Sequence, residues 1–80
     1  MNNPIKPDET HDFIGLFCPE PVFRTRQALD QMNVDGILEV IADDPAAEED
    51  IPRMIKNLNQ SLLRVTKDNN EFHFYIKKIK

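Results

Sequence analysis

The chain has 80 residues, of which 40% are hydrophobic and 30% are charged, a balance typical of one small globular domain. Its 14 acidic residues outnumber its 10 Lys and Arg residues, so the net charge of -4 argues against binding nucleic acid by neutralising many phosphates. No apolar run approaches the roughly 20 residues that span a bilayer, and the N-terminus lacks the apolar segment of a secretion signal. The one cysteine, Cys18, excludes an intramolecular disulfide and a dithiol pair, and we expect a reduced, cytoplasmic monomer.

We expect residues 1–9 to form a flexible N-terminal tail and residues 10–80 to form a single domain. Strand-forming segments are spread along most of this domain. In the last strand-forming segment Phe72 and Phe74 alternate with His73 and Tyr75, which indicates a strand with one buried face. The expected strands are residues 11–17, 37–42, 62–67 and 71–78, with a hairpin turn at residues 68–70.

Two segments between these strands carry helix signals. Proline is favoured in the first turn of a helix, so Cys18-Pro19-Glu20-Pro21 predicts a helix over residues 18–33 whose N-cap is Cys18. Asp43-Asp44-Pro45 repeats the signal as an acidic cap before a second helix over residues 46–58, and an internal proline places the start of its main part near Asp50. The predicted inner faces are Val22, Thr25, Ala28, Leu29 and Met32 in the first helix, and Ile51, Met54, Ile55 and Leu58 in the second.

The resulting order is strand, helix, strand, helix, strand, strand. Right-handed crossovers place both helices on the same face of one sheet. The sequence therefore predicts an α/β (α+β) two-layer sandwich, βαβαββ, with a mixed four-stranded sheet and two helices on one face.

Cys18 is the residue on which any covalent chemistry would depend. The partial positive charge of a helix N-terminus stabilises a thiolate, and Pro19 and Pro21 leave the Glu20 N–H as the nearest first-turn donor for the sulfur, with that of Val22 next. The Glu20 carboxylate acts in the opposite direction, so we expect a modest lowering of the Cys18 pKa.

The alternative for Cys18 is an ordinary buried cysteine, although a junction flanked by Glu20 and two prolines is a poor place to bury a side chain. The chain has no second cysteine, and neither His11 nor His73 has the spacing of a catalytic partner. What remains is the chemistry of a single sulfur: carrying a group from one molecule to another, or sensing oxidants.

Two other clusters have simpler interpretations. Asp43 and Asp44 could suggest a metal site, but no His or Cys ligand accompanies them, so we interpret the pair as a helix cap and expect neither metal nor cofactor. The aromatic residues from Phe72 to Tyr75, followed by Lys77, Lys78 and Lys80, resemble a base-stacking surface. Because Phe72 and Phe74 are expected to face the core, direct binding of nucleic acid is disfavoured.

Three stretches of the chain together resemble the TusA family of small sulfur carriers, also called SirA-like proteins. They are Asp12-x-x-Gly15-Leu16-x-Cys18-Pro19-Glu20-Pro21-Val22, the run from Leu38 to Ala46 that contains Asp43-Asp44-Pro45, and Asp50-Ile51-Pro52. The likeness extends from about His11 to Lys78, and Glu20 with the run Ile41–Pro45 most resembles TusA itself. The chain departs from the family at Asn59-Gln60, where many members have a Gly-His or Glu-His pair.

The resemblance implies that Cys18 carries sulfur as a persulfide, supported by the helix start at Pro19, Glu20 and Pro21. It implies a sulfurtransferase component, which acts as a carrier and not as a stand-alone enzyme. The donor would be a cysteine desulfurase and the acceptor a TusBCD-type relay complex, towards 2-thiolation of the wobble uridine of tRNA. A different sulfur-trafficking or sulfur-oxidation route, and a non-catalytic protein or RNA interaction module, are the alternatives.

Docking to the desulfurase is expected on the first turns of the first helix. Glu20, Phe23 and Arg26 lie three residues apart and form one stripe beside Cys18. Phe23 falls outside the predicted inner face, as suits a small transient interface. The alternative is that Phe23 packs against the sheet and Arg26 is a solvated charge.

Overall fold

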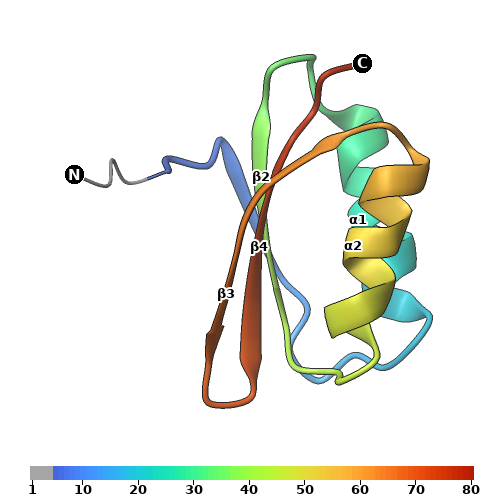
Figure 1. Ribbon diagram of the computed structural model, residues 1–80, viewed down its shortest axis with the longest axis vertical. Coiled ribbons are helices and arrows are strands. Elements are labelled where there is room, and N and C mark those ends of the chain that lie inside the picture. The colour runs from blue at the N-terminus through green and yellow to red at the C-terminus, as the bar shows by residue number, and fades with distance from the viewer. Residues whose placement is uncertain (1–4) are drawn as a thin grey trace.

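The computed structural model describes residues 5–80, and these residues form the predicted two-layer sandwich (Figure 1). The four strands make one mixed sheet in the order β1-β2-β4-β3, in which β1 and β2 are parallel and β4 is antiparallel to both of its neighbours. Both helices lie on the same side of this sheet, as predicted (Figure 1). The elements are β1 (Glu9–Asp12), α1 (Glu20–Gln31), β2 (Ile37–Ala42), α2 (Ala47–Asn57), β3 (Ser61–Asp68) and β4 (Glu71–Lys77).

The first strand is displaced from the prediction of residues 11–17. It begins at Glu9, inside the expected tail, and ends at Asp12. Parallel pairing with β2 holds these four residues, and the Asp12 carboxylate then accepts the Ile14 N–H at 2.9 Å, which turns the chain away from the sheet. The apolar residues that suggested a longer strand therefore lie in a loop. Residues 1–4 of the expected tail lie outside the described residues.

The first helix starts later than predicted, because its N-cap is Pro19 and not Cys18. Pro21 is buried in the first turn, and its carbonyl accepts the Thr25 hydroxyl at 2.7 Å. The predicted inner face is confirmed, since four of its members are buried and Val22 packs against the core.

The second helix runs without a break from Ala47 to Asn57, although Pro52 lies inside it, so the predicted later start near Asp50 is wrong. It ends in a tight motif in which the Gln60 N–H reaches the Ile55 carbonyl and Asn59 adopts the left-handed conformation, with φ of 58°.

The core lies between the helices and the covered face of the sheet. Leu38 and Val40 of β2 and Phe74 and Ile76 of β4 have no exposed surface and pack against both helices. Phe72, Phe74 and Ile76 are buried and alternate with more exposed side chains, as the period-two pattern predicts. At the hairpin between β3 and β4, Asn69 has φ of 58°, as its place in the predicted turn requires.

Candidate functional site

Cys18 lies in the loop that joins β1 to α1, and its side chain is exposed. This loop is at the lower end of the molecule in Figure 1. Two consecutive turns shape this loop: the Leu16 N–H donates to the Phe13 carbonyl at 3.1 Å, and the Glu20 N–H donates to the Phe17 carbonyl at 2.9 Å. The exposure excludes the alternative of a buried structural cysteine. The second turn uses the Glu20 N–H as the donor to the Phe17 carbonyl, so the prediction that this N–H is available to the sulfur is wrong.

Asp43 and Asp44, at the end of β2, fasten this loop to the sheet. Asp43 accepts the Gly15 N–H at 2.9 Å, and Asp44 accepts the Cys18 N–H at 2.7 Å. Asp44 is only 8% exposed, and its second oxygen accepts the Ala46 N–H at 3.3 Å. The predicted acidic cap is therefore corrected, because the N-cap of α2 is Ala46, whose own side chain makes no capping hydrogen bond, and Asp44 reaches only the backbone N–H of this residue. The two carboxylates mainly determine where the backbone of Cys18 lies.

The first turns of α2 place a third carboxylate beside the sulfur. The Cys18 thiol donates to the Asp50 Oδ2 over 3.8 Å, and the other oxygen of Asp50 lies 3.6 Å from a guanidinium nitrogen of Arg53. Asp50 belongs to the Asp-Ile-Pro motif, but nothing in the sequence alone connects it with Cys18, 32 positions earlier. The fold brings the two together because both helices begin at the same end of the sandwich (Figure 1).

The electrostatic surroundings of Cys18 differ from the sequence expectation. Partial desolvation, then the negative charges of Asp50 and Asp44 and the hydrogen bond to Asp50, raise the pKa of the thiol. The predicted modest lowering of the pKa is therefore wrong. The prediction considered the start of the first helix alone, whereas the carboxylates come from the β2–α2 loop and from the second helix.

Apolar side chains are exposed around Cys18. Phe17, the residue before it, is 73% exposed, and Phe23 on α1 is 62% exposed. The exposure of Phe23 excludes the alternative in which it packs against the sheet. Glu20 is bound to Arg24 at 2.9 Å, and Arg26 is exposed. Phe17 was missed because the sequence placed it in a strand; its surface position follows from the early end of β1.

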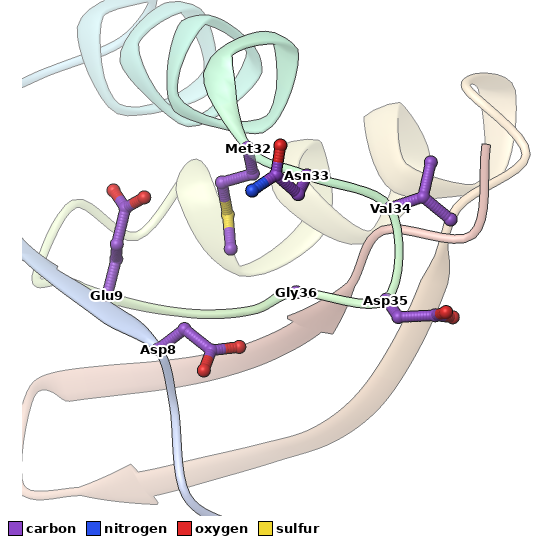
Figure 2. A pocket seen from close by; sticks show the side chains of 7 residues that line it. All are labelled: Asp8, Glu9, Met32, Asn33, Val34, Asp35 and Gly36. Atoms are coloured by element: carbon purple, nitrogen blue, oxygen red, sulfur yellow. The ribbon is translucent and has the colours of Figure 1, made fainter.

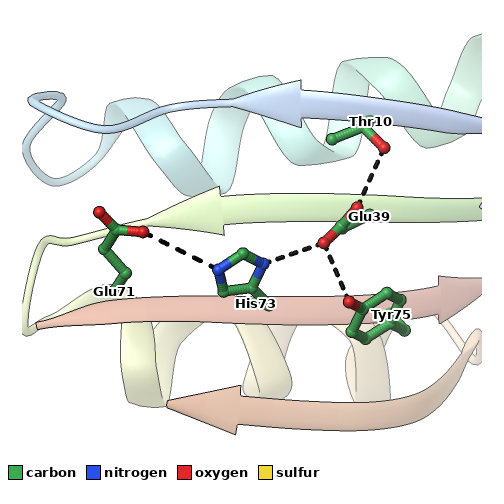
Figure 3. A network of polar contacts seen from close by, with 5 residues as sticks. All are labelled: Thr10, Glu39, Glu71, His73 and Tyr75. Carbon is green, nitrogen blue, oxygen red and sulfur yellow. Dashed lines mark hydrogen bonds and ion pairs between the residues drawn. The ribbon is translucent and has the colours of Figure 1, made fainter. Parts of the chain in front are cut away.

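The open face of the sheet carries a separate polar network (Figure 3). The Glu39 carboxylate accepts hydrogen bonds from Tyr75 at 3.0 Å and Thr10 at 3.1 Å, and it lies 2.9 Å from His73 Nδ1. Desolvation and the hydrogen bond to Glu39 raise the pKa of Tyr75. The side chains of His73 and Tyr75 thus contact Glu39, while Phe72 and Phe74 are buried, which leaves no row of free rings on this strand for stacking bases.

A hollow of about 390 Å³ lies at the opposite end of the molecule from Cys18, beside the loop between α1 and β2 (Figure 2). Its lining residues are Asp8, Glu9, Met32, Asn33, Val34, Asp35 and Gly36. Within residues 5–80, no group of three or more His, Cys, Asp or Glu side chains is arranged to hold a metal ion. In the same part of the chain, neither helix is long and apolar enough to cross a membrane.

The chain is similar to known proteins over nearly its whole length. The family model for the sulfurtransferase TusA matches residues 9–78. An Archaeoglobus fulgidus protein described as "Putative sulfur carrier protein" is 49% identical over 70 residues, which are 86% of this chain and 91% of the relative. The sulfur carrier protein TusA of Pseudomonas putida is 39% identical over 72 residues, covering 90% of each chain.

The fold has a counterpart among solved structures. The crystal structure of a SirA-like protein from Desulfitobacterium hafniense superimposes with a TM-score of 0.77 at 24% sequence identity, covering 90% of this chain and 99% of the other. It has the same α+β sandwich. The family match and the two relatives confirm the resemblance that began with Cys-Pro-Glu-Pro: the chain belongs to the TusA family of sulfur carrier proteins.

Proposed function

We propose that the chain accepts sulfur on Cys18 as a persulfide from a cysteine desulfurase and passes it to an acceptor protein. The observation that carries the proposal is an exposed lone thiol on a residue whose backbone N–H is bound by Asp44, in a chain of the TusA family. Carriers of this family relay sulfur to partner proteins. An exposed thiol suits this role, because two sulfur atoms on different proteins must come into direct contact.

The transfer is a displacement at sulfur. The Cys18 sulfur attacks the outer sulfur of the donor's persulfide, a new S–S bond forms at Cys18, and the S–S bond of the donor breaks. The donor cysteine leaves as a thiolate and takes up the proton that Cys18 loses. The products are a persulfide on Cys18 and a free thiol on the donor, so no external oxidant or reductant is required.

Intact-mass measurement tests this step. The protein is incubated with a cysteine desulfurase and L-cysteine, and the expected product has the added mass of one sulfur atom. Cys18→Ser is the matched control, and it should fold normally because Cys18 is exposed and a serine hydroxyl can also donate to Asp50. No adduct on the wild-type protein, or an equal adduct on Cys18→Ser, would contradict the proposal.

For the acceptor, we propose a TusBCD-type relay complex and 2-thiolation of the tRNA wobble uridine. The support is the 39% identity to a protein named TusA and the likeness of Glu20 and Ile41–Pro45 to TusA itself. The test is a deletion strain, in which the wobble 2-thiouridine should disappear while other thiolated tRNA bases remain. Normal levels of that nucleoside would assign the carrier to another route.

A different sulfur-trafficking or sulfur-oxidation route is the alternative. The Archaeoglobus fulgidus relative, at 49% identity, is described as a putative sulfur carrier protein, which is compatible with either route. Proteins that co-purify with the persulfidated chain distinguish the routes: recovery of a TusBCD-type complex supports tRNA thiolation, and recovery of a sulfur-oxidising enzyme supports the alternative.

We place the docking surface for the donor on Glu20, Phe23 and Arg26, and we add Phe17. Two exposed aromatic rings near a reactive sulfur offer the apolar contact on which small transient interfaces depend. Arg26 is an exposed cation on the same helix and would act mainly on the rate of association.

A further inference from the structure

The thiol of Cys18 faces a carboxylate from a different helix, and the persulfide chemistry proposed above does not use this contact. Asp50 is half-buried, its Oδ2 accepts the thiol over 3.8 Å, and its Oδ1 lies 3.6 Å from Arg53. The two contacts use different oxygens of the carboxylate, so the ion pair with Arg53 leaves the other oxygen of Asp50 available to the thiol.

Negative charge predominates among the groups that face Cys18. Asp44 reaches it from the β2–α2 loop and Asp50 from α2, whereas Glu20 on α1 is bound to Arg24. Arg53 is the cation beside Asp50, and it pairs with the carboxylate oxygen that does not accept the thiol. A thiolate at this position would lie next to two carboxylates, so the neutral thiol is favoured and can donate its proton to Asp50.

We propose that Asp50 is the positioning residue of Cys18: it holds the sulfur as a neutral, oriented thiol in the free protein, and the sulfur donor relieves this restraint by bringing a cationic group to Asp50. The donor part of this inference rests on the proposed function; the restraint itself does not. The arrangement slows reaction with small electrophiles and oxidants while the protein is unbound. A donor with a cation beside its own cysteine then restores the reactivity at the moment of contact.

The first experiment measures alkylation of Cys18 by iodoacetamide as a function of pH, with no sulfur donor present. Asp50→Asn removes the charge but keeps the shape, so the midpoint of the pH–rate profile should fall and alkylation at pH 7 should rise about three- to tenfold, since one pKa unit is tenfold in thiolate. Asp50→Glu should restore a high midpoint. An Asp50→Asn profile that overlays the wild type overturns the proposal.

Two further variants test whether a change in the alkylation profile is specific to Asp50 or comes from a general change in folding or charge. Glu48→Gln makes the same change of charge two residues earlier on α2, where the side chain is exposed and does not bond to Cys18, so its profile should stay within about twofold of the wild type. Arg53→Gln removes the cation that partly neutralises Asp50, so the midpoint of the Cys18 alkylation profile should move to higher pH in this variant. An equal shift in Glu48→Gln, or a downward shift in Arg53→Gln, contradicts a specific role for Asp50.

The second experiment measures sulfur uptake from the desulfurase by the same variants. If the donor neutralises Asp50 on contact, Asp50→Asn should raise the rate of alkylation but leave the rate of sulfur uptake unchanged. Equal gains in both reactions would overturn the donor part of the proposal. If the wild type takes up no sulfur at all, the proposed function fails, while the alkylation profiles still decide whether Asp50 restrains the thiol.

Discussion

The two ends of the sandwich both carry carboxylates, but they use them differently. At the end with Cys18, Asp43 and Asp44 bind backbone N–H groups of the loop, and Asp50 contacts the sulfur. At the opposite end, Asp8 accepts the Ile37 N–H at 2.8 Å and helps to line a hollow of about 390 Å³ (Figure 2). No thiol lines this hollow, and Cys18 is not among its lining residues.

This contrast shows what kind of site a sulfur carrier requires. Enzymes that act on small molecules usually enclose them in a concave pocket. A protein that exchanges sulfur with another protein instead needs a thiol that projects from a rigid surface, with apolar contact area around it. Phe17 and Phe23 provide that area beside Cys18. In this protein, an exposed cysteine on a loop held by hydrogen bonds indicates function better than the size of the hollow does.

The largest expected effect comes from removing the carboxylate that fixes the cysteine loop. Asp44→Ala leaves the Cys18 and Ala46 N–H groups without their acceptor in a partly buried place, which should cost about 2 to 3 kcal/mol of the free energy of unfolding. Because the sulfur is no longer held in position, the initial rate of sulfur uptake should fall at least tenfold, by an order-of-magnitude estimate. Urea unfolding and intact-mass kinetics measure the two effects.

Asp8→Ala is the matched control at the opposite end, since Asp8 also accepts a backbone N–H but is exposed. It should lower the free energy of unfolding by about 1 kcal/mol and leave sulfur uptake unchanged. If both variants reduce uptake in proportion to their loss of stability, Asp44 has no special relation to Cys18 and the functional contrast between the two ends is lost.

An intermediate effect is expected at the docking surface. Phe23→Ala should slow sulfur uptake from the desulfurase about fivefold, and Arg26→Glu should slow it more at low than at high salt, because screening weakens interactions between exposed charges. Val34 is the control for the ring, because it is 55% exposed at the opposite end. Val34→Ala should accept sulfur at the wild-type rate. Wild-type rates for both Phe23→Ala and Arg26→Glu would place the docking surface elsewhere.

The fold could be predicted from the sequence because its signals are local and periodic. Helical spacing identified the inner faces of α1 and α2, and alternation in β4 identified its buried side. The error at the first strand arose from one distant and one local contact that the apolar pattern does not reveal. β1 ends at Asp12 because of its pairing with β2 and a turn made by its own carboxylate, and neither could be recognised in a run of apolar residues.

The site could be predicted only in part for the same reason. Cys18 was recognisable from its motif, and the exposed Phe23 from its helical position. The roles of Asp44 and Asp50 were not, since they depend on contacts across 26 and 32 positions of the chain. In the sequence, an aspartate before Pro45 is explained equally well by a helix cap. Only the structure shows that Asp44 binds the backbone of the cysteine loop.

The smallest effect on sulfur uptake is expected from the open face of the sheet, whose polar network includes no residue of the cysteine loop and no residue that lines the hollow. Desolvation acts to raise the pKa of Glu39, but its hydrogen bonds to His73, Tyr75 and Thr10 outweigh this and lower it (Figure 3). A lowered pKa in the folded state means that the carboxylate stabilises the protein above its unfolded pKa of about 4.5 and loses this contribution as the pH falls through the folded value.

Glu39→Gln should therefore cost about 1 kcal/mol of the free energy of unfolding at pH 7, and the difference from the wild type should shrink as the pH falls below 4.5, the unfolded pKa, and through the lower pKa of the folded state. Glu71→Gln is the control, because the Glu71 carboxylate is 53% exposed and lies 3.9 Å from His73, so its removal should change stability by less than about 0.5 kcal/mol. Urea unfolding at several pH values measures both variants, and each should take up sulfur at the wild-type rate. A loss of uptake in Glu39→Gln as large as that in Phe23→Ala would mean that the donor also contacts the open face, and the docking surface would then extend from the cysteine loop onto the sheet.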